Sequence, residues 1–243
     1  MGDEHKIGHG TFPRTPPQIL SMPKAFEADL KEMRENNYRL DLPVVLHVTL
    51  LKSPQVKDAD IPLKDWIGVT DSVLAAHNIT VNYHPVSKIP ITLKTSGNPL
   101  KLQDDIAEIR QAAHVSFQDN AAPPRLPIII CEFSRELREG TAGLTKVNQA
   151  APPDGRVQLS DGTTWLPFVL LPTGDAVADN ATMVHEIAHS TMLTHGTSGG
   201  DNLNILNDNL SLDRTQFVRR HVNKFQLRRI ARAYFALPKL VVK

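Results

Sequence analysis

Apolar residues along the chain occur in two spacings, and each spacing is typical of one kind of element. Nearly continuous apolar runs are typical of buried strands, whereas apolar residues that recur every three or four positions indicate helices. The first pattern predicts strands over residues 43–51, 79–83, 89–93, 126–133, 143–147, 157–159 and 165–171. The second predicts helices over residues 21–37, 62–77, 102–113, 182–192 and 212–235, the last either continuous or broken near Asn223. Strands and helices therefore alternate first, and helices end the chain.

Two of the predicted strands differ in where proline lies. The run at 43–51 has proline only at its first residue, and its continuous apolar character favours a central strand. The run at 165–171 contains Pro167 within it. Because proline cannot donate a hydrogen bond to a neighbouring strand, we expect 165–171 to lie at an edge of the sheet.

The composition indicates a soluble globular protein, with 41% hydrophobic and 22% charged residues among 243. The formal net charge of +1 gives no reason to expect a polyanionic partner. No apolar run is long enough to span a membrane, and the first residues carry no apolar signal segment, so we expect a cytoplasmic protein or one exported without such a signal. The single cysteine, Cys131, excludes an internal disulfide; it is expected to be a small buried residue, with a zinc-capping thiol as the alternative.

The stretch that carries chemistry begins with His185-Glu186-Ile187-Ala188-His189, an HExxH sequence within a predicted helix. Residues four apart share one helix face, so His185 and His189 can direct two imidazoles at one metal ion. Glu186 is one step around the helix, where it can reach water at the metal without acting as a ligand. This spacing therefore predicts a metal site with a general base beside it.

A third ligand is expected from the residues that follow the helix. His195 lies six residues after His189 and can join the site only if the chain reverses after Met192. Three neutral imidazoles would hold Zn²⁺ and leave its fourth position open, as catalytic zinc requires. Asp201 is the one nearby carboxylate that offers an alternative third ligand.

The stretch from His185 to His195 resembles the metzincin zinc peptidases, whose pattern is HExxHxxGxxH. The resemblance implies an α+β zincin fold: a twisted mixed sheet with an antiparallel edge strand, backing helices, an active-site helix and a small C-terminal helical subdomain. It divides one catalytic domain into an upper subdomain at 21–195 and the small subdomain at 196–243. Residues 1–20, rich in proline and glycine, are expected to form a flexible tail.

Two positions depart from the metzincin pattern. Met192 stands where the family has glycine, so the reversal requires either a left-handed Met192 or a different turn built with Gly196. No methionine follows Met192, and Asn204-Ile205-Leu206-Asn207 resembles the Asn-Leu-Met segment of some bacterial metzincins. Leu206 is then expected to form the apolar floor beneath the metal ligands.

The predicted function is that of a zinc-dependent endopeptidase in which Glu186 is the general base toward zinc-activated water, His185, His189 and His195 bind Zn²⁺, and a peptide or protein is the substrate. The departures at Met192 and Leu206 motivate one alternative, a weakly active or inactive metzincin-like protein that binds peptides. A second alternative is a nucleic-acid-binding module led by the basic residues between 214 and 243, which otherwise form a solvated helix face. For oxyanion stabilisation the candidates are Tyr234, His221 or an arginine of the last helix, and the sequence does not choose between them.

Overall fold

The computed structural model describes residues 4–7, 30–52, 56–57, 61–88, 124–131, 143–148, 157–158, 164–165, 167–173, 180–207 and 219–239. The predicted strand at 89–93 and the predicted helix at 102–113 lie outside these ranges. Of the predicted helix at 21–37, the described part is helical only at residues 30–32, so that helix ends earlier than its apolar spacing indicated. Among the described residues, no helix has the length and apolar character needed to cross a membrane.

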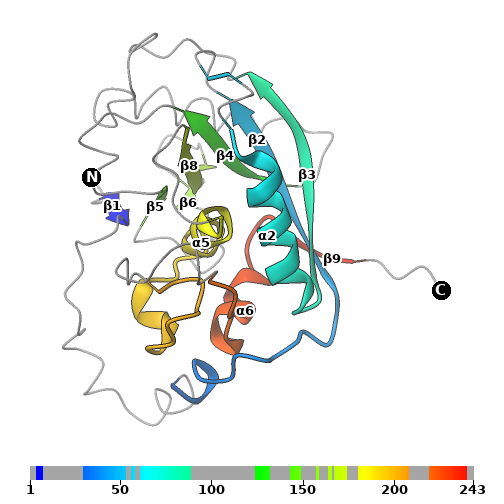
Figure 1. Cartoon of the computed structure of the whole chain (residues 1–243), viewed down its shortest axis with the longest axis vertical. Coiled ribbons are helices and arrows are strands. Elements are labelled where there is room, and N and C mark those ends of the chain that lie inside the picture. Colours follow the sequence, from blue (N-terminus) through cyan, green and yellow to red (C-terminus); the bar gives the residue numbers. More distant parts are fainter. Residues whose placement is uncertain are drawn as a thin grey trace.

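A mixed sheet forms the centre of the molecule, with strands in the order β1-β5-β8-β4-β2-β3 and β9 paired with β2 (Figure 1). The pairs β2–β3, β2–β4 and β4–β8 are parallel, whereas β5–β8, β1–β5 and β2–β9 are antiparallel. These strands are β1 (Glu4–Ile7), β2 (Val44–Lys52), β3 (Ile79–Lys88), β4 (Leu126–Cys131), β5 (Leu144–Asn148), β8 (Phe168–Pro172) and β9 (Ala236–Pro238). A separate antiparallel pair is formed by β6 (Val157–Gln158) and β7 (Thr164–Trp165).

The prediction that residues 165–171 lie at an edge of the sheet is wrong, because β8 lies between β4 and β5 and pairs with both. Pro167 precedes β8 and Pro172 is its last residue, so neither proline interrupts the middle of the strand. The residues between them, Phe168 to Leu171, are all fully buried. Their continuous apolar character was the better guide to position than the proline beside them.

Two helices, α2 (Leu63–Ala75) and α5 (Thr182–His189), pack against each other and share the hydrophobic core with the sheet. On β2 the alternate residues Leu46, Val48 and Leu50 enter this core. All eight residues of α5 are buried, as expected for a helix enclosed on every side. The motif helix therefore lies at the centre of the described structure, as Figure 1 shows.

Beyond α5 the chain forms a 3-10 helix (His195–Ser198), an irregular segment to Asn207, and α6 (Lys224–Ile230). Of the predicted helix at 212–235, residues 212–218 lie outside the described ranges; residues 219–223 are not helical, and α6 begins only after Asn223, the alternative break point. Leu206, Val222 and Leu227 join the same hydrophobic cluster as α5 and β2. This lower part of the molecule is thus packed directly beneath the motif helix (Figure 1).

Candidate metal centre

The first two histidines come from successive turns of α5. The side chains of His185 and His189 are 1% and 0% exposed, and their Nε2 atoms lie 3.0 Å apart. The helix places them there because residues four apart stand one above the other on the same face. Buried imidazoles with facing nitrogens need a partner between them, either a shared proton or a cation.

The chain reverses directly after α5, and Met192 makes the reversal. Its φ is +66°, in the left-handed region that non-glycine residues rarely adopt. The amide of Met192 donates to the carbonyl of His189, at 3.0 Å, and the next carbonyl, that of Leu193, lies 2.7 Å from His189 Nδ1. The left-handed Met192 predicted from the sequence is confirmed; Gly196 does not have a positive φ.

The reversal brings the third histidine to the other two. His195, 8% exposed, opens the 3-10 helix, and its Nε2 lies 3.1 Å from that of His189 and 3.3 Å from that of His185. Among the described residues, these three histidines are the one group of three or more potential ligands whose donor atoms converge. They could hold a metal ion.

The geometry of the three nitrogens fits zinc. Two nitrogen ligands of a tetrahedral Zn²⁺, each about 2.0–2.1 Å from the ion, lie roughly 3.3 Å apart. The observed separations of 3.0, 3.1 and 3.3 Å are close to that value. The Nδ1 atoms of His185 and His189 face the backbone carbonyls of Ile205 and Leu193, at 2.5 and 2.7 Å. A carbonyl can only accept, so it favours a proton on Nδ1 and leaves the Nε2 lone pair for a metal.

Arg219 contacts the same site and was not identified from the sequence. Its Nη1 lies 2.8 Å from His185 Nδ1 and 2.9 Å from the carbonyl oxygen of Asn207. A guanidinium only donates, so it competes with Ile205 for the role of Nδ1 partner. With His185 Nε2 as a ligand, Nδ1 is protonated and donates to Ile205, and Arg219 then donates to Asn207. Arg219 stands within a run of basic residues, and nothing in that run distinguishes it.

Glu186 is buried beside β5 and is not a member of the histidine group. The hydroxyl of Thr145 lies 2.6 Å from Glu186 Oε2 and 2.9 Å from the Glu186 carbonyl oxygen. A Cβ built on Gly143 would lie 2.7 Å from both Cγ and Oε1 of Glu186, so only glycine fits there. Burial raises the pKa of Glu186 to about 8, although the Thr145 hydrogen bond and the charge of Arg219 lower it. The carboxyl is thus held firmly and takes up a proton readily.

The segment beneath the histidines has the apolar character expected from the sequence. Leu206 and Ile205 are fully buried within the hydrophobic cluster that contains α5. The amide of Leu206 donates to Asn204 Oδ1 at 2.9 Å, which closes a tight turn. This turn presents the Ile205 carbonyl to His185. The segment 204–207 therefore supports the site through the Ile205 carbonyl, while Leu206 is buried in the core that it shares with α5.

Asp201, the alternative third ligand, is engaged elsewhere. Its Oδ2 accepts hydrogen bonds from Asn36 Nδ2 and His221 Nδ1, each at 2.8 Å, and its Oδ1 accepts from the amide of Leu203. Asp201 does not belong to the converging group of ligands. Both of its oxygens instead fasten the segment after His195 to neighbouring parts of the chain.

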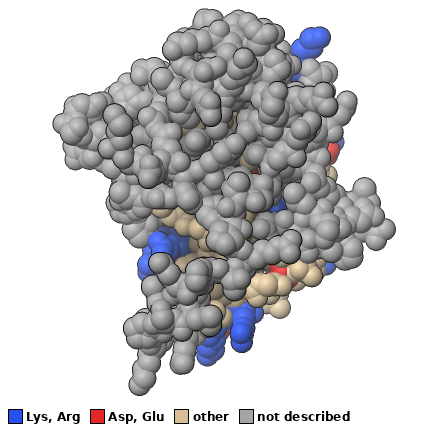
Figure 2. Space-filling view, turned by 90° about the vertical axis from the view of Figure 1, so that its left-hand side faces the viewer, with Lys and Arg blue, Asp and Glu red and all other residues tan. Residues whose placement is uncertain are grey.

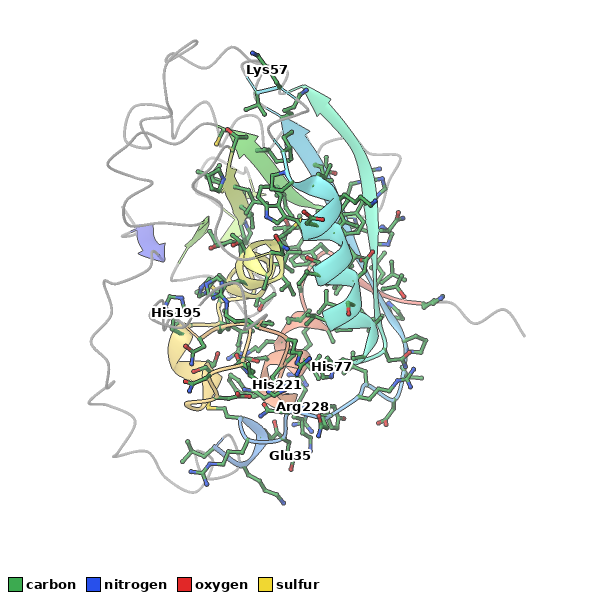
Figure 3. All side chains as sticks on the ribbon, in the orientation of Figure 1. Glu35, Lys57, His77, His195, His221 and Arg228 are labelled. Carbon is green, nitrogen blue, oxygen red and sulfur yellow. The ribbon has the colours of Figure 1, made fainter. Side chains whose placement is uncertain are left out.

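The other candidates make contacts outside the histidine group. His221 pairs with Asp201, and the side chains of His221 and His195 lie apart in Figure 3. The hydroxyl of Tyr234 donates to the carbonyl of Arg125. Cys131 is buried in β4, as a small apolar residue would be. These contacts select none of the three for a part in catalysis.

The basic C-terminal region is partly neutralised. Arg228 Nη1 lies 2.5 Å from Glu32 Oε1, and Lys224 Nζ lies 3.2 Å from Glu35 Oε2. On the face shown in Figure 2, the visible lysine and arginine side chains lie in separate groups among residues that the structure does not describe. The two ion pairs offset part of the positive charge of the described C-terminal residues.

Comparison with known proteins gives a likeness to solved structures but no match in sequence. No family model matches the sequence, and no curated protein matches it significantly. Among solved structures, the fold is similar to that of metalloproteinase-II from Bacteroides fragilis, with 12% sequence identity and a TM-score of 0.47. The similarity covers 83% of this chain and 60% of that one, so this chain spans about three fifths of the length of that structure.

Proposed function

We propose that this protein is a zinc-dependent metallopeptidase whose metal is held by His185, His189 and His195. The observation that carries the proposal is the convergence of three buried Nε2 atoms within 3.0–3.3 Å, next to a buried carboxyl on the same helix. A closed structural zinc site uses four protein ligands. Three ligands are characteristic of catalytic zinc, which keeps one position for water or substrate.

Zinc, when bound, supplies a concentrated positive charge that polarises a substrate carbonyl and acidifies nearby water. The chain supplies the proton acceptor. Glu186 takes a proton from the attacking water on a carboxylate oxygen and then gives it to the amine that leaves. A carboxyl whose pKa is raised to about 8 by burial holds a transferred proton better than an ordinary glutamate does. Hydrolysis consumes one water and yields a new carboxyl and a new amine.

Thr145 and Gly143 determine where this proton acceptor stands. The Thr145 hydroxyl contacts both the carboxylate and the backbone carbonyl of Glu186, and Gly143 leaves room for its Cγ. A base that is held in place needs no reorganisation when the proton moves. A peptide or protein is the substrate class that this chemistry serves. The alternative function is a zinc-containing protein that binds peptides without cleaving them, which the strained Met192 and the absent Met-turn methionine motivate.

The experiment compares three purified chains: wild type, Glu186→Gln and His189→Ala. Metal analysis should give about one zinc per chain for wild type and Glu186→Gln, and much less for His189→Ala. Cleavage of a proteome-derived peptide library should be chelator-sensitive in wild type and reduced by at least about 10²–10⁴-fold in Glu186→Gln. Full zinc content in His189→Ala would refute the metal site. Zinc in wild type without cleavage of any peptide would favour the peptide-binding alternative.

A further inference from the structure

Three amide side chains are completely buried, two of them bond to each other, and the third bonds to the backbone of one of that pair. Asn204, Asn223 and Gln226 are each 0% exposed. Asn204 Nδ2 donates to Gln226 Oε1 at 3.0 Å, and Gln226 Nε2 donates to Asn204 Oδ1 at 2.9 Å. Burying three amides away from water is costly unless their donors and acceptors are satisfied.

One arm of the cluster reaches the turn that carries His195. Asn223 Nδ2 donates to the carbonyl of Thr197 at 2.7 Å. Gln226 Nε2 lies 3.2 Å from the same carbonyl and 3.3 Å from Thr197 Oγ1. Thr197 belongs to the 3-10 helix that begins at His195. Two buried amides thus hold that short helix by a single carbonyl oxygen two residues after the proposed ligand.

The other arm reaches the carbonyl that orients His185. Asn204 Oδ1 accepts from the amide of Leu206, which shapes the turn containing Ile205. The Ile205 amide donates to the carbonyl of His221 at 2.9 Å, and the Ile205 carbonyl faces His185 Nδ1. Gln226 bonds Asn204 through both of its polar atoms. One side chain therefore links the supports of two different proposed ligands.

Two of the three amides, Asn223 and Gln226, lie at the start of helix α6, which fixes their positions. Asn223 caps the helix: its Oδ1 accepts from the Gln226 amide at 2.9 Å, and the Asn223 amide donates to Gln226 Oε1 at 3.1 Å. The reciprocal cap sets the direction of both amide side chains. The segment they hold, from His195 to Asn207, contains Gly199 and Gly200 at positive φ and forms little regular structure of its own. Its order depends on contacts such as these.

We propose that Gln226, together with Asn204 and Asn223, is a positioning device for the metal centre, which holds His195 and the Ile205 carbonyl in place before the metal binds. This inference rests on the proposed metal site. None of the three amides bonds to a histidine in the described contacts; each acts through Thr197 or through the turn at Ile205. Without them, the segment would have to be ordered at the moment of binding, and that entropy cost would weaken metal affinity.

The test uses variants that separate positioning from general stability. Gln226→Met keeps the length of the side chain and removes every hydrogen bond it makes. Asn223→Asp keeps the oxygen that caps α6 but loses the Nδ2 donor to Thr197, so the helix is retained while the His195 turn is released. Val73→Ala in α2 is the control: it removes buried apolar volume from the shared core, in a helix that supplies neither a proposed ligand nor a hydrogen bond to the amide cluster.

Zinc affinity is measured by chelator competition well below the unfolding temperature, and ligand geometry by the visible spectrum of the Co²⁺-loaded protein. We expect an affinity loss of about 10–100-fold and an altered cobalt spectrum for Gln226→Met, as for other residues that orient metal ligands. Asn223→Asp should lose affinity in the same direction; because its carboxyl is buried and faces the Thr197 carbonyl, it should also lower thermal stability, and Val73→Ala shows how much of the affinity loss such destabilisation explains. Val73→Ala should lose stability but keep the wild-type affinity and spectrum.

The result that overturns the inference is wild-type zinc affinity and cobalt spectrum in both amide variants. An equal loss of affinity in Val73→Ala would also overturn it, because the effect would then be one of general stability. If Gln226→Met does not fold, Asn223→Asp alone decides. A wild-type chain that binds no zinc refutes the metal site itself, which is a different result from variants that bind as wild type does.

Discussion

The strained residue at the chain reversal allows a direct measurement. Met192 has a φ of +66°, and an L-residue in this conformation costs about 1–2 kcal/mol. Glycine avoids that cost but loses more backbone entropy on folding, about 0.5–1 kcal/mol. The Met192 side chain is half-buried, so its removal also costs packing energy. A single Met192→Gly variant would mix these three effects.

The comparison of Met192→Gly with Met192→Ala removes the packing effect, because both variants lose the side chain. The difference that remains is the relief of backbone strain minus the extra entropy that glycine loses on folding; it spans roughly 0–1.5 kcal/mol and favours glycine by about 0.75 kcal/mol at the middle of the two ranges. For a chain of 243 residues this corresponds to an unfolding midpoint about 2–4 °C higher per kcal/mol. Both variants should keep zinc, because His189 Nδ1 still meets the Leu193 carbonyl when the turn is unchanged.

Calorimetric unfolding of both variants, with zinc and with chelator, measures this difference. An alanine variant more stable than the glycine variant would contradict the assignment of strain to position 192. A glycine variant that loses zinc would show that the methionine side chain, and not only the backbone conformation, holds the reversal.

Three further predictions follow from described contacts. Leu206→Met should leave zinc content unchanged, since the two side chains are close in volume, whereas Leu206→Asp should impair folding or zinc binding; metal analysis of soluble protein tests both. Gly143→Ala should reduce peptide cleavage while zinc is retained, because its Cβ would lie 2.7 Å from Glu186 Cγ; equal turnover would refute the close contact. Burial lowers the pKa of His77, although the hydrogen bond to the Tyr38 carbonyl opposes the shift. The neutral His77 imidazole therefore stabilises the fold fully above the unfolded pKa of about 6.5. This stabilisation is lost as the pH falls through the lower pKa of the folded protein. The midpoint of His77→Asn should therefore depend less on pH below about 6.5 than that of wild type, and parallel pH profiles would contradict this assignment.

The sequence predicted those features that depend on neighbours along the chain. His185 and His189 share a face because helix geometry requires it, and a reversal was needed if His195 was to reach them, although the sequence left open whether Met192 or Gly196 would make it. The strand at 44–52 and the helix at 63–75 follow from apolar spacing alone. In each case the determining interaction is local, or the stretch is apolar enough to leave one arrangement.

Features that depend on distant partners were not predicted. The position of β8 between β4 and β5 is a matter of sheet order, which the residues of β8 do not encode by themselves. Thr145, the partner of Glu186, precedes it by 41 residues. Arg219 and Gln226 are ordinary residues in a basic, helical stretch, and only the fold brings them to the histidines. The non-helical form of 219–223 has the same origin, since the pairing of His221 with Asn204 outweighs its helical spacing.

Because β9 is synthesised long after β2, the pairing of these two strands affects how the chain folds during synthesis. Val44 pairs with Pro238, so β2 leaves the ribosome long before this neighbour exists. Asn223 and Gln226 also emerge after the three histidines, and α6 cannot fasten the His195 turn until then. Such non-local contacts form slowly and late. Nascent chains should therefore expose the proposed ligands before they can hold an ion tightly, and zinc loading should follow synthesis of α6 and β9.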